Sequence, residues 1–175
     1  MIELKRIFPE CCADTILVEK ILQRGRPAHY HGINNVGEAL CNYGGGEFII
    51  GLIDTDKFKR KDPKIGLFTA LVTDELHDQK LMHDQKILIR RLPETNKYII
   101  RIHPEFEPWI WDLAAQCSID PGDPEYGFDT LVKLGEATKT EEAFNNPKLK
   151  KFINAVVLQN PPPIQTLRFW LSKVF

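Results

Sequence analysis

Acidic side chains follow two apolar segments of the chain, and they are the residues best suited to chemistry. Glu10 follows residues 2–8, and Asp54 and Asp56 directly follow the strongly apolar residues 47–53. Positions i and i+2 of an extended chain point to the same side, roughly 6.5–7 Å apart. Two carboxylates placed in this way repel each other unless they are solvated, protonated or bridged by a cation. Mg²⁺, or Mn²⁺ in its place, is the natural cation, because it takes oxygen ligands from one or two carboxylates together with substrate phosphates.

A run of basic residues begins at the position after Asp56. It contains Lys57, Lys59, Arg60 and Lys61. A phosphate backbone that is held over a metal ion needs cations beside the metal, so these residues are candidates for nucleic-acid or phosphate binding. The plainer interpretation is a solvated basic loop that follows an ordinary acidic turn.

The elements that would position these residues follow from the hydrophobic pattern. Residues 2–8 alternate as a strand, and residues 13–24 carry the apolar stripe of a helix. A short strand at 29–31 and a short helix that ends at the glycines 44–46 come next. The continuous apolar run 47–53 is typical of a strand buried on both faces. This alternation of strands and helices predicts a parallel α/β core, in which ligands gather at the carboxyl ends of the strands.

The second half of the chain predicts a hairpin and several helices. Residues 86–92 and 97–102 are strand candidates joined by a turn-forming segment, and residues 65–73 could form a helix between the acidic run and this hairpin. Residues 105–117 have apolar positions at helical spacing, and the C-terminal third is helical. We therefore expect one α/β domain over residues 1–175, with a core at about 1–117 and a helical C-terminal extension at about 118–175.

Composition narrows the class of protein. The 175 residues carry a net charge of −1, which excludes a globally basic nucleic-acid binder but leaves room for a local basic patch. None of the four cysteines lies in a CxxC pair, so a structural zinc site of that kind is not expected. No apolar run reaches the roughly 18 residues of a membrane span, and the N-terminus does not read as a signal peptide. These features predict a cytoplasmic protein without a membrane partner.

Two short motifs resemble those of the Toprim fold, which is shared by topoisomerases, primases and old-lysogenisation-defect nucleases. The segment Glu10-Cys11-Cys12-Ala13-Asp14 is similar to the family's E-G-x-x-D motif, with cysteine at the glycine position. Asp54-Thr55-Asp56 is similar to its D-x-D motif, and the match covers about the first 60 residues. The resemblance implies a Toprim-like Rossmannoid with a mainly parallel sheet, an added hairpin and C-terminal helices. It also implies that Glu10, Asp54 and Asp56 bind Mg²⁺ and take part in catalysis.

Two further acids could join this site. Small Toprim-like proteins carry a glutamate-tryptophan motif on a later helix, and Glu107, two residues before Trp109, is similar to it. Asp14 is the other candidate, although both acids could simply favour the first turn of a helix. His29 and His31, at i and i+2, could share a face and hint at a zinc or phosphate site.

Three functions remain open from the sequence. The first is a Mg²⁺-dependent, Toprim-like nuclease that cleaves phosphodiester bonds in DNA or RNA. The second is a non-catalytic module that binds a nucleic acid or a protein. The cysteine at position 11, in place of the motif glycine, favours this function. In such a module, Phe169, Trp170 and Phe175 of the C-terminal helices could contact a protein partner or a second copy of the chain. The third is a phosphatase or phosphotransfer domain with Asp54 as nucleophile.

Overall fold

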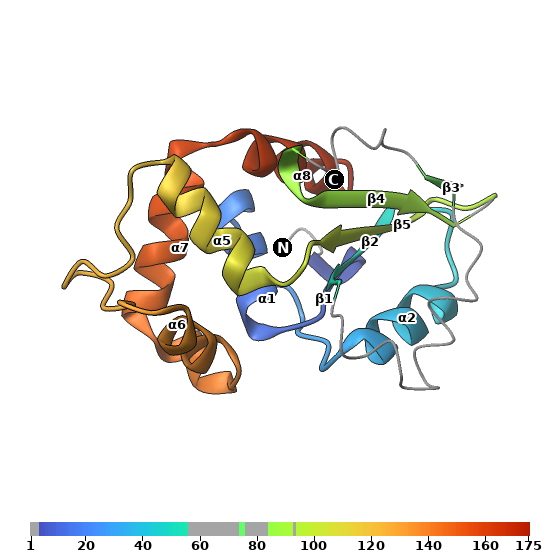
Figure 1. Cartoon of the computed structure of the whole chain (residues 1–175). Helices are drawn as coiled ribbons and strands as arrows, with labels where there is room; N and C mark the ends of the chain where they lie inside the picture. Colours follow the sequence, from blue (N-terminus) through green and yellow to red (C-terminus); the bar gives the residue numbers. More distant parts are fainter. Residues whose placement is uncertain (1–3, 56–73, 76–83, 93) are drawn as a thin grey trace.

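The structure is a computed structural model that describes residues 4–55, 74–75, 84–92 and 94–175 (Figure 1). Its strands are β1 (Ile7–Pro9), β2 (Ile49–Asp54), β3 (Asp74–Glu75), β4 (Ile87–Arg91) and β5 (Lys97–Ile102). Its α-helices are α1 (Cys12–Leu22), α2 (Ile33–Asn42), α5 (Phe106–Gln116), α6 (Leu131–Thr138), α7 (Pro147–Gln159) and α8 (Pro162–Ser172). Short 3₁₀ turns, η1 (Leu4–Arg6) and η4 (Glu141–Asn145), complete the described elements.

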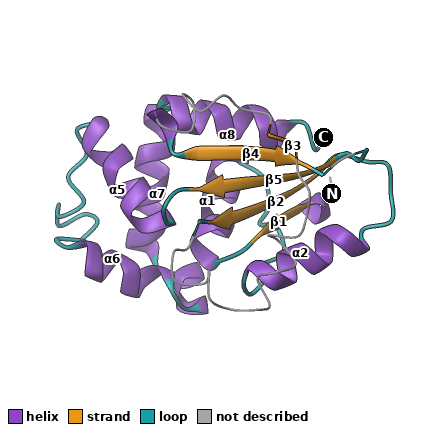
Figure 2. Ribbon diagram, turned by 45° about the vertical axis from the view of Figure 1, so that its right-hand side comes forward, coloured by secondary structure: helices purple, strands orange, loops and turns teal. Residues whose placement is uncertain are grey.

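One mixed sheet organises the molecule, with the strand order β1-β2-β5-β4-β3. β1, β2 and β5 run parallel, and the register pairs Ile7 with Ile50 and Asp54 with Ile102. β4 and β3 continue the sheet in antiparallel pairing. The chain is therefore an α/β protein, as the sequence predicts. Because the parallel strands are neighbours, their carboxyl ends lie along one edge of the sheet, visible in Figure 2.

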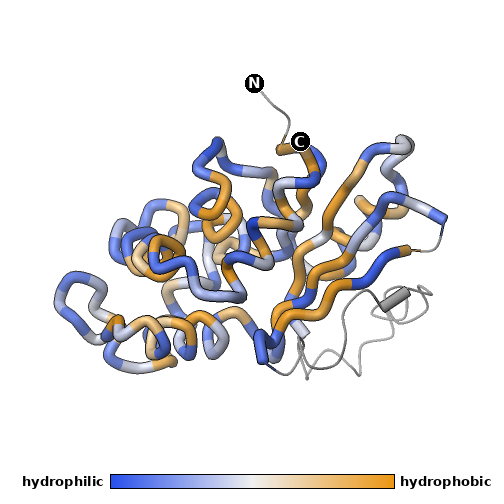
Figure 3. The backbone as a smooth tube through the Cα atoms, turned by 90° about the horizontal axis from the view of Figure 1, so that it is seen from above, coloured by the Kyte–Doolittle hydropathy of each residue, from blue (hydrophilic) through white to orange (hydrophobic). Residues whose placement is uncertain are grey.

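The alternating side chains of β2 explain why helices cover both faces of the sheet. Ile50 and Leu52 belong to a core cluster that includes buried residues of α1, α5, α7 and α8. Ile49 and Ile53 point the other way and pack with buried residues of α2. Figure 3 shows these strands coloured mostly as hydrophobic, as expected for a sheet buried on both faces.

Gly51 in β2 allows α2 to approach the sheet closely. A Cβ atom at this position would lie 2.8 Å from side-chain atoms of both Val36 and Leu40. Such contacts are too short for a methyl group, so any larger residue would push α2 away from the strand. The glycine thus sets the spacing of the layer that covers this face.

Several predicted elements are confirmed, and others are wrong in detail. The helix predicted at 13–24 is α1, the hairpin at 86–92 and 97–102 is β4–β5, and the helix at 105–117 is α5. The hairpin is not peripheral, because β5 pairs with β2 inside the sheet. The first predicted strand, residues 2–8, coincides with β1 only at residues 7 and 8, because residues 4–6 form η1; residues 2–3 lie outside the described residues. The helix predicted at 65–73 lies outside the described residues.

The strand predicted at 29–31 is also wrong. The segment forms a loop that leads into α2, tied to the end of β1 by a hydrogen bond of 3.0 Å from the Tyr30 N–H to the Pro9 carbonyl. One such bond does not make a ladder, so the histidines on either side of Tyr30 lie on irregular backbone rather than on a strand.

The C-terminal helices pack against the rest of the chain through α1. α1 contacts both α7 and α8, and the large apolar side chains of α7 between positions 149 and 157 are buried. The cluster that contains Ile7 of β1 also contains Val174 near the C-terminus. The sheet and the C-terminal extension therefore share one continuous core. In the part of the chain that the structure describes, no helix is both long and apolar enough to cross a membrane.

Candidate functional site

The structure brings Glu10, Asp14 and Asp54 of the two motifs together at the carboxyl edge of the parallel strands. Glu10 follows β1 and Asp54 is the last residue of β2. The Glu10 N–H donates to the Leu52 carbonyl at 2.9 Å. In return, the Asp54 N–H donates to Oε2 of Glu10 at 3.1 Å. The glutamate side chain thereby joins the ends of both strands, and its exposed fraction is only 5%.

Asp14 enters the same site from the first turn of α1. Its N–H donates to Sγ of Cys11, and its Oδ2 accepts the Cys11 N–H, each at 3.3 Å. This reciprocal pair is a capping box, with a thiol in place of the usual hydroxyl. Cys11 has φ −125°, an ordinary extended conformation, so the backbone here does not require the glycine of the Toprim motif. Asp14 is therefore both a capping residue and a buried carboxyl group.

Burial and mutual repulsion raise the pKa values of the two aspartates. Burial, and then the charge of Glu10, raises the pKa of Asp14 to about 8, although hydrogen bonds from Cys11 oppose the change. Burial raises the pKa of Asp54 well above its usual range, and the charges of Asp14 and Glu10 add to the increase. These couplings require the three carboxyl groups to lie near one another, because Coulomb interactions fall with distance.

Glu107 is the fourth member of the site. Its charge contributes to the raised pKa values of both Asp14 and Asp54. It lies in the first turn of α5, and its Oε1 accepts a hydrogen bond from Oγ1 of the buried Thr138 at the end of α6. Glu10, Asp14, Asp54 and Glu107 are hereafter the acid cluster.

Two buried oxygens of the acid cluster require a proton or a cation. Oδ1 of Asp14 and Oδ1 of Asp54 are buried, and neither has a hydrogen-bond partner among the described residues. A buried carboxylate oxygen without a donor is costly, so each must be protonated or approached by a cation. The oxygen-only donor set fits Mg²⁺ or Mn²⁺.

Helix N-termini supply the electropositive part of this edge. α1 begins beside Glu10, and α5 begins where the backbone N–H of Phe106 hydrogen-bonds to Asp54 and opposes the increase in its pKa. A helix N-terminus carries partial positive charge and favours anions such as phosphate. The edge thus combines carboxylates for a cation with two helix ends suited to an anion.

The carboxylates do not form a closed cage. Among the residues that the structure describes, only His29, His31 and Glu141 bring three potential ligand atoms within 4.8 Å of one another. The acid cluster is more open, which suits Mg²⁺ because this ion usually keeps several waters and takes one or two carboxylates directly. The predicted ligand Asp56 lies outside the described residues, as does the basic run Lys57, Lys59, Arg60 and Lys61.

The sequence analysis did not include Glu141 in any site. It lies more than a hundred positions after the two histidines, at the start of η4, and its neighbour Glu142 is equally acidic. No local spacing distinguishes one from the other. Only the packing of η4 against α1 brings Glu141 to the histidines.

Comparisons with models of protein families, with curated proteins and with solved structures give no match to this chain. The fold and the site together define an α/β protein with an acid cluster at the carboxyl edge of its parallel strands. Its function is therefore proposed from the chemistry of that edge.

Proposed function

We propose that the acid cluster binds Mg²⁺ or Mn²⁺ and that the chain is a Toprim-like enzyme that cleaves phosphodiester bonds of DNA or RNA. The observation that carries the proposal is the meeting of Glu10, Asp14 and Asp54 at one sheet edge, with two buried aspartate oxygens that lack partners. Carboxyl ends of parallel strands are where α/β proteins bind ligands. The helix N-termini of α1 and α5 at this edge support a phosphate-containing substrate.

The residues have distinct roles in this proposal. Glu10 and Asp54 hold the cation, with Glu10 kept in place by the Asp54 N–H. A bound Mg²⁺ supplies Lewis-acid stabilisation of the charge that develops on the phosphate. Asp14, with a pKa of about 8, keeps a proton at neutral pH and so limits the negative charge that the phosphate meets. The partial positive charge at the N-terminus of α5 favours the substrate anion.

A non-catalytic Toprim-like module is the second candidate. Within the described part of the chain, no three residues of the acid cluster bring ligand oxygens within 4.8 Å of one another, so a metal held by three of these carboxylates at once is not preformed, and this favours binding without catalysis. The cysteine in place of the motif glycine no longer distinguishes the two candidates, because Cys11 occupies an unstrained N-cap. Metal-dependent turnover separates them: an enzyme cleaves substrate when Mg²⁺ or Mn²⁺ is added, whereas a module binds substrate without cleaving it.

The test combines calorimetry with a cleavage assay. The purified chain is titrated with Mg²⁺ and with Mn²⁺, alone and in the presence of short single- and double-stranded DNA and RNA. Cleavage of the same oligonucleotides is then followed. Asp54→Asn keeps the size of the side chain but removes its charge, and Glu10→Gln does the same. We expect each to lower metal affinity and cleavage by about 100-fold or more, since losing even an outer-shell partner of a metal costs about 10–100-fold.

Asp129→Asn is the matched control. Asp129 is an exposed acid that pairs with Lys133 in a surface salt bridge, so its loss should change neither metal binding nor cleavage. Oligonucleotide binding without cleavage, unaffected by Mg²⁺, would favour the non-catalytic module. Metal binding and cleavage that persist in both Asp54→Asn and Glu10→Gln would contradict the proposed site.

A further inference from the structure

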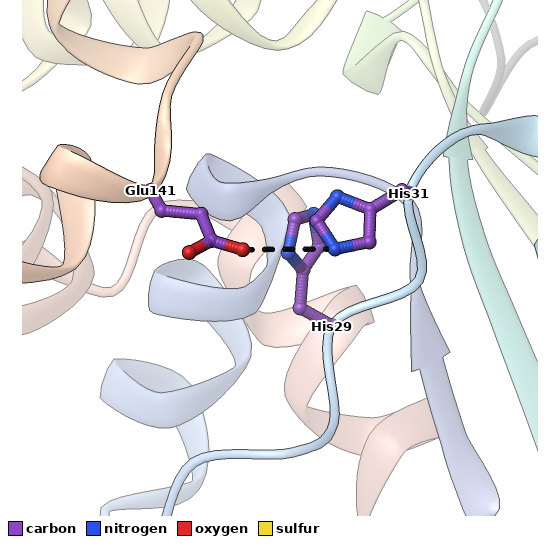
Figure 4. A group of neighbouring side chains, drawn as sticks. All are labelled: His29, His31 and Glu141. Carbon is purple, nitrogen blue, oxygen red and sulfur yellow. Dashed lines mark ion pairs between the residues drawn. The ribbon is translucent and has the colours of Figure 1, made fainter.

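A second cluster of potential metal ligands lies on a different part of the molecule. His29 and His31 come from the loop before α2, and Glu141 is the first residue of η4. Figure 4 shows the three side chains directed toward one another, with the ion pair between His31 and Glu141 marked. The potential ligand atoms of all three residues lie within 4.8 Å of one another. These residues are hereafter the histidine cluster.

Hydrogen bonds fix the backbone that carries the two histidines. The Tyr30 N–H donates to the Pro9 carbonyl at 3.0 Å, and the Gly32 N–H donates to the Glu10 carbonyl at 3.2 Å. The carbonyl of His31 accepts a hydrogen bond of 2.8 Å from Nδ2 of Asn35 in α2. The loop is thus anchored to β1 on one side and to α2 on the other, so both imidazoles are presented by a restrained segment rather than by a free one.

Packing fixes the carboxylate partner in a similar way. Two residues after Glu141, Ala143 is 1% exposed and belongs to the main core. The ring of Phe144 meets the ring of His29 edge to face, with centroids 5.6 Å apart. η4 therefore cannot slide along α1 without losing these contacts, and Glu141 stays opposite the histidines.

We propose that His29, His31 and Glu141 form a binding site for Zn²⁺ or a similar late first-row divalent ion. Two imidazole nitrogens and one carboxylate oxygen are a donor set that suits zinc and differs from the oxygen-only set that suits Mg²⁺. Nε2 of His31 and Oε1 of Glu141 are 3.7 Å apart. Two ligands of one tetrahedral zinc ion lie about 3.3 Å apart for metal–ligand bonds near 2.0 Å, so the His31–Glu141 pair needs a shift of only a few tenths of an ångström, and the other two pairs close from within 4.8 Å.

The site has room for a ligand that the protein does not supply. Three protein ligands leave at least one position of a tetrahedral ion for water or another small donor. A cleft of about 370 Å³ adjoins the histidines, and its other lining residues include Asn35, Glu38 and Asn42 of α2. These three side chains offer hydrogen-bonding groups to water or to a small ligand at the open position.

A buried thiol beside His29 must be distinguished from a fourth ligand. Sγ of Cys12 lies 3.9 Å from both ring nitrogens of His29, so it faces the ring rather than one nitrogen. It does not belong to the group of atoms that lie within 4.8 Å of one another. We therefore expect a site with two nitrogen ligands and one oxygen ligand and without sulfur.

Zinc binding to the full chain, purified without a histidine tag, tests this inference. Cys41 is exposed, so the measurements use a Cys41→Ser background to remove an adventitious thiol. Calorimetry or competition with a chromogenic chelator should give one Zn²⁺ per chain. Excess Mg²⁺ should not reduce this stoichiometry, and the Asp54→Asn variant should show the same value. His29→Asn, His31→Asn and Glu141→Gln should each weaken binding by about 10–100-fold. These side chains are on the surface (His31 is 65% and Glu141 75% exposed), so His31→Asn and Glu141→Gln should keep the fold.

Glu142→Gln is the matched control, since it removes the adjacent exposed acid that lies outside the cluster, and it should leave zinc affinity unchanged. Replacing Zn²⁺ with Co²⁺ reports the ligand type, because thiolate ligands give a strong charge-transfer band in the near ultraviolet. We expect no such band. A thiolate band, no stoichiometric zinc binding, or equal affinities in Glu141→Gln and Glu142→Gln would each overturn the proposed site. Loss of the acid-cluster function in Asp54→Asn would leave this result unaffected.

Discussion

The acid cluster and the histidine cluster are built in opposite ways. The acid cluster lies at strand ends and helix starts inside the core, where Asp14 is fully buried and Glu10 is 5% exposed. The histidine cluster lies on a loop and a 3₁₀ turn, where the side chains of His31 and Glu141 are 65% and 75% exposed. Water can solvate the second group in the absence of a metal, whereas Glu10 and Asp14 of the first are shielded from water.

This difference in burial predicts a difference in stability. Carboxyl groups that are crowded and buried destabilise the fold when they are ionised, unless a cation compensates them. Exposed imidazoles and an exposed carboxylate change the free energy of unfolding little, in either direction. A site that destabilises the metal-free protein is typical of a functional site, whereas a surface cluster has to be recognised from its ligand geometry.

The largest expected effect is the pH dependence of stability set by Asp14. Its pKa is about 8 in the folded chain against an ordinary value of 3.8, so the folded state binds more protons than the unfolded state between these values. The free energy of unfolding should therefore fall as pH rises from about 4 to about 8, by at most about 1.4 kcal/mol per pH unit for this group. Asp14→Asn, which keeps an acceptor for the Cys11 N–H, should remove the part of this slope that Asp14 contributes, leave the part due to Asp54, and be the more stable chain at pH 8.

Denaturant unfolding at pH 5, 6.5 and 8 in the presence of a chelator measures this effect. Asp129→Asn serves as the control, because its exposed carboxyl group should leave the slope of the native chain unchanged. Equal slopes in the native chain and in Asp14→Asn would show that the carboxyl group of Asp14 is ionised without penalty. The contrast between the two clusters would then lose its energetic basis.

The next effect concerns metal affinity and sharpens the same comparison. Protons compete with Mg²⁺ for Asp54, and the loss of the Asp14 proton adds a negative charge beside the cation, so the Mg²⁺ affinity of the acid cluster should increase between pH 6.5 and 8.5, by up to about tenfold per pH unit. Burial lowers the pKa of His29, so this imidazole is already neutral in the same range. Zinc affinity should therefore change little between pH 7 and 8.5.

Parallel titrations with Mg²⁺ and with Zn²⁺ at the two ends of these pH ranges measure how each affinity depends on pH. Asp14→Asn should flatten the Mg²⁺ profile and leave the zinc profile as it was. A zinc affinity that follows the same pH profile as Mg²⁺, and loses it in Asp14→Asn, would mean that both ions bind at the acid cluster.

The sequence predicted the acid cluster better than the histidine cluster, for a physical reason. Glu10 and Asp54 each follow an apolar segment, and carboxyl ends of neighbouring parallel strands share one edge. Local pattern therefore predicts that these two residues meet, and the hydrogen bond from the Asp54 N–H to Glu10 fulfils that expectation. Glu141 meets His31 through the packing of η4 on α1, which no short spacing encodes.

The errors in the fold have a similar origin. The hairpin of residues 87–102 was predicted from local features, chiefly its turn. Its position in the sheet depends instead on long-range pairing, and β5 lies next to β2 inside the sheet. Residues 4–6 carry part of an alternating pattern, yet they form η1 because β2 pairs only with residues 7–9. In both cases the structure depends on which strands pair with each other, and this pairing cannot be inferred from the local pattern of a single sequence.

The smallest expected effect tests the cysteine that separates this chain from the Toprim motif. Sγ of Cys11 accepts the Asp14 N–H at the start of α1, so Cys11→Ala should lower the free energy of unfolding by about 1 kcal/mol. Cys11→Gly, which introduces the motif residue, should cost only a few tenths of a kcal/mol, since glycine is tolerated at an N-cap. Thermal unfolding of the two variants at pH 6.5 distinguishes these values. If Cys11→Gly instead strengthens Mg²⁺ binding several-fold, then the thiol obstructs the cation, and the cysteine rather than the openness of the acid cluster limits catalysis.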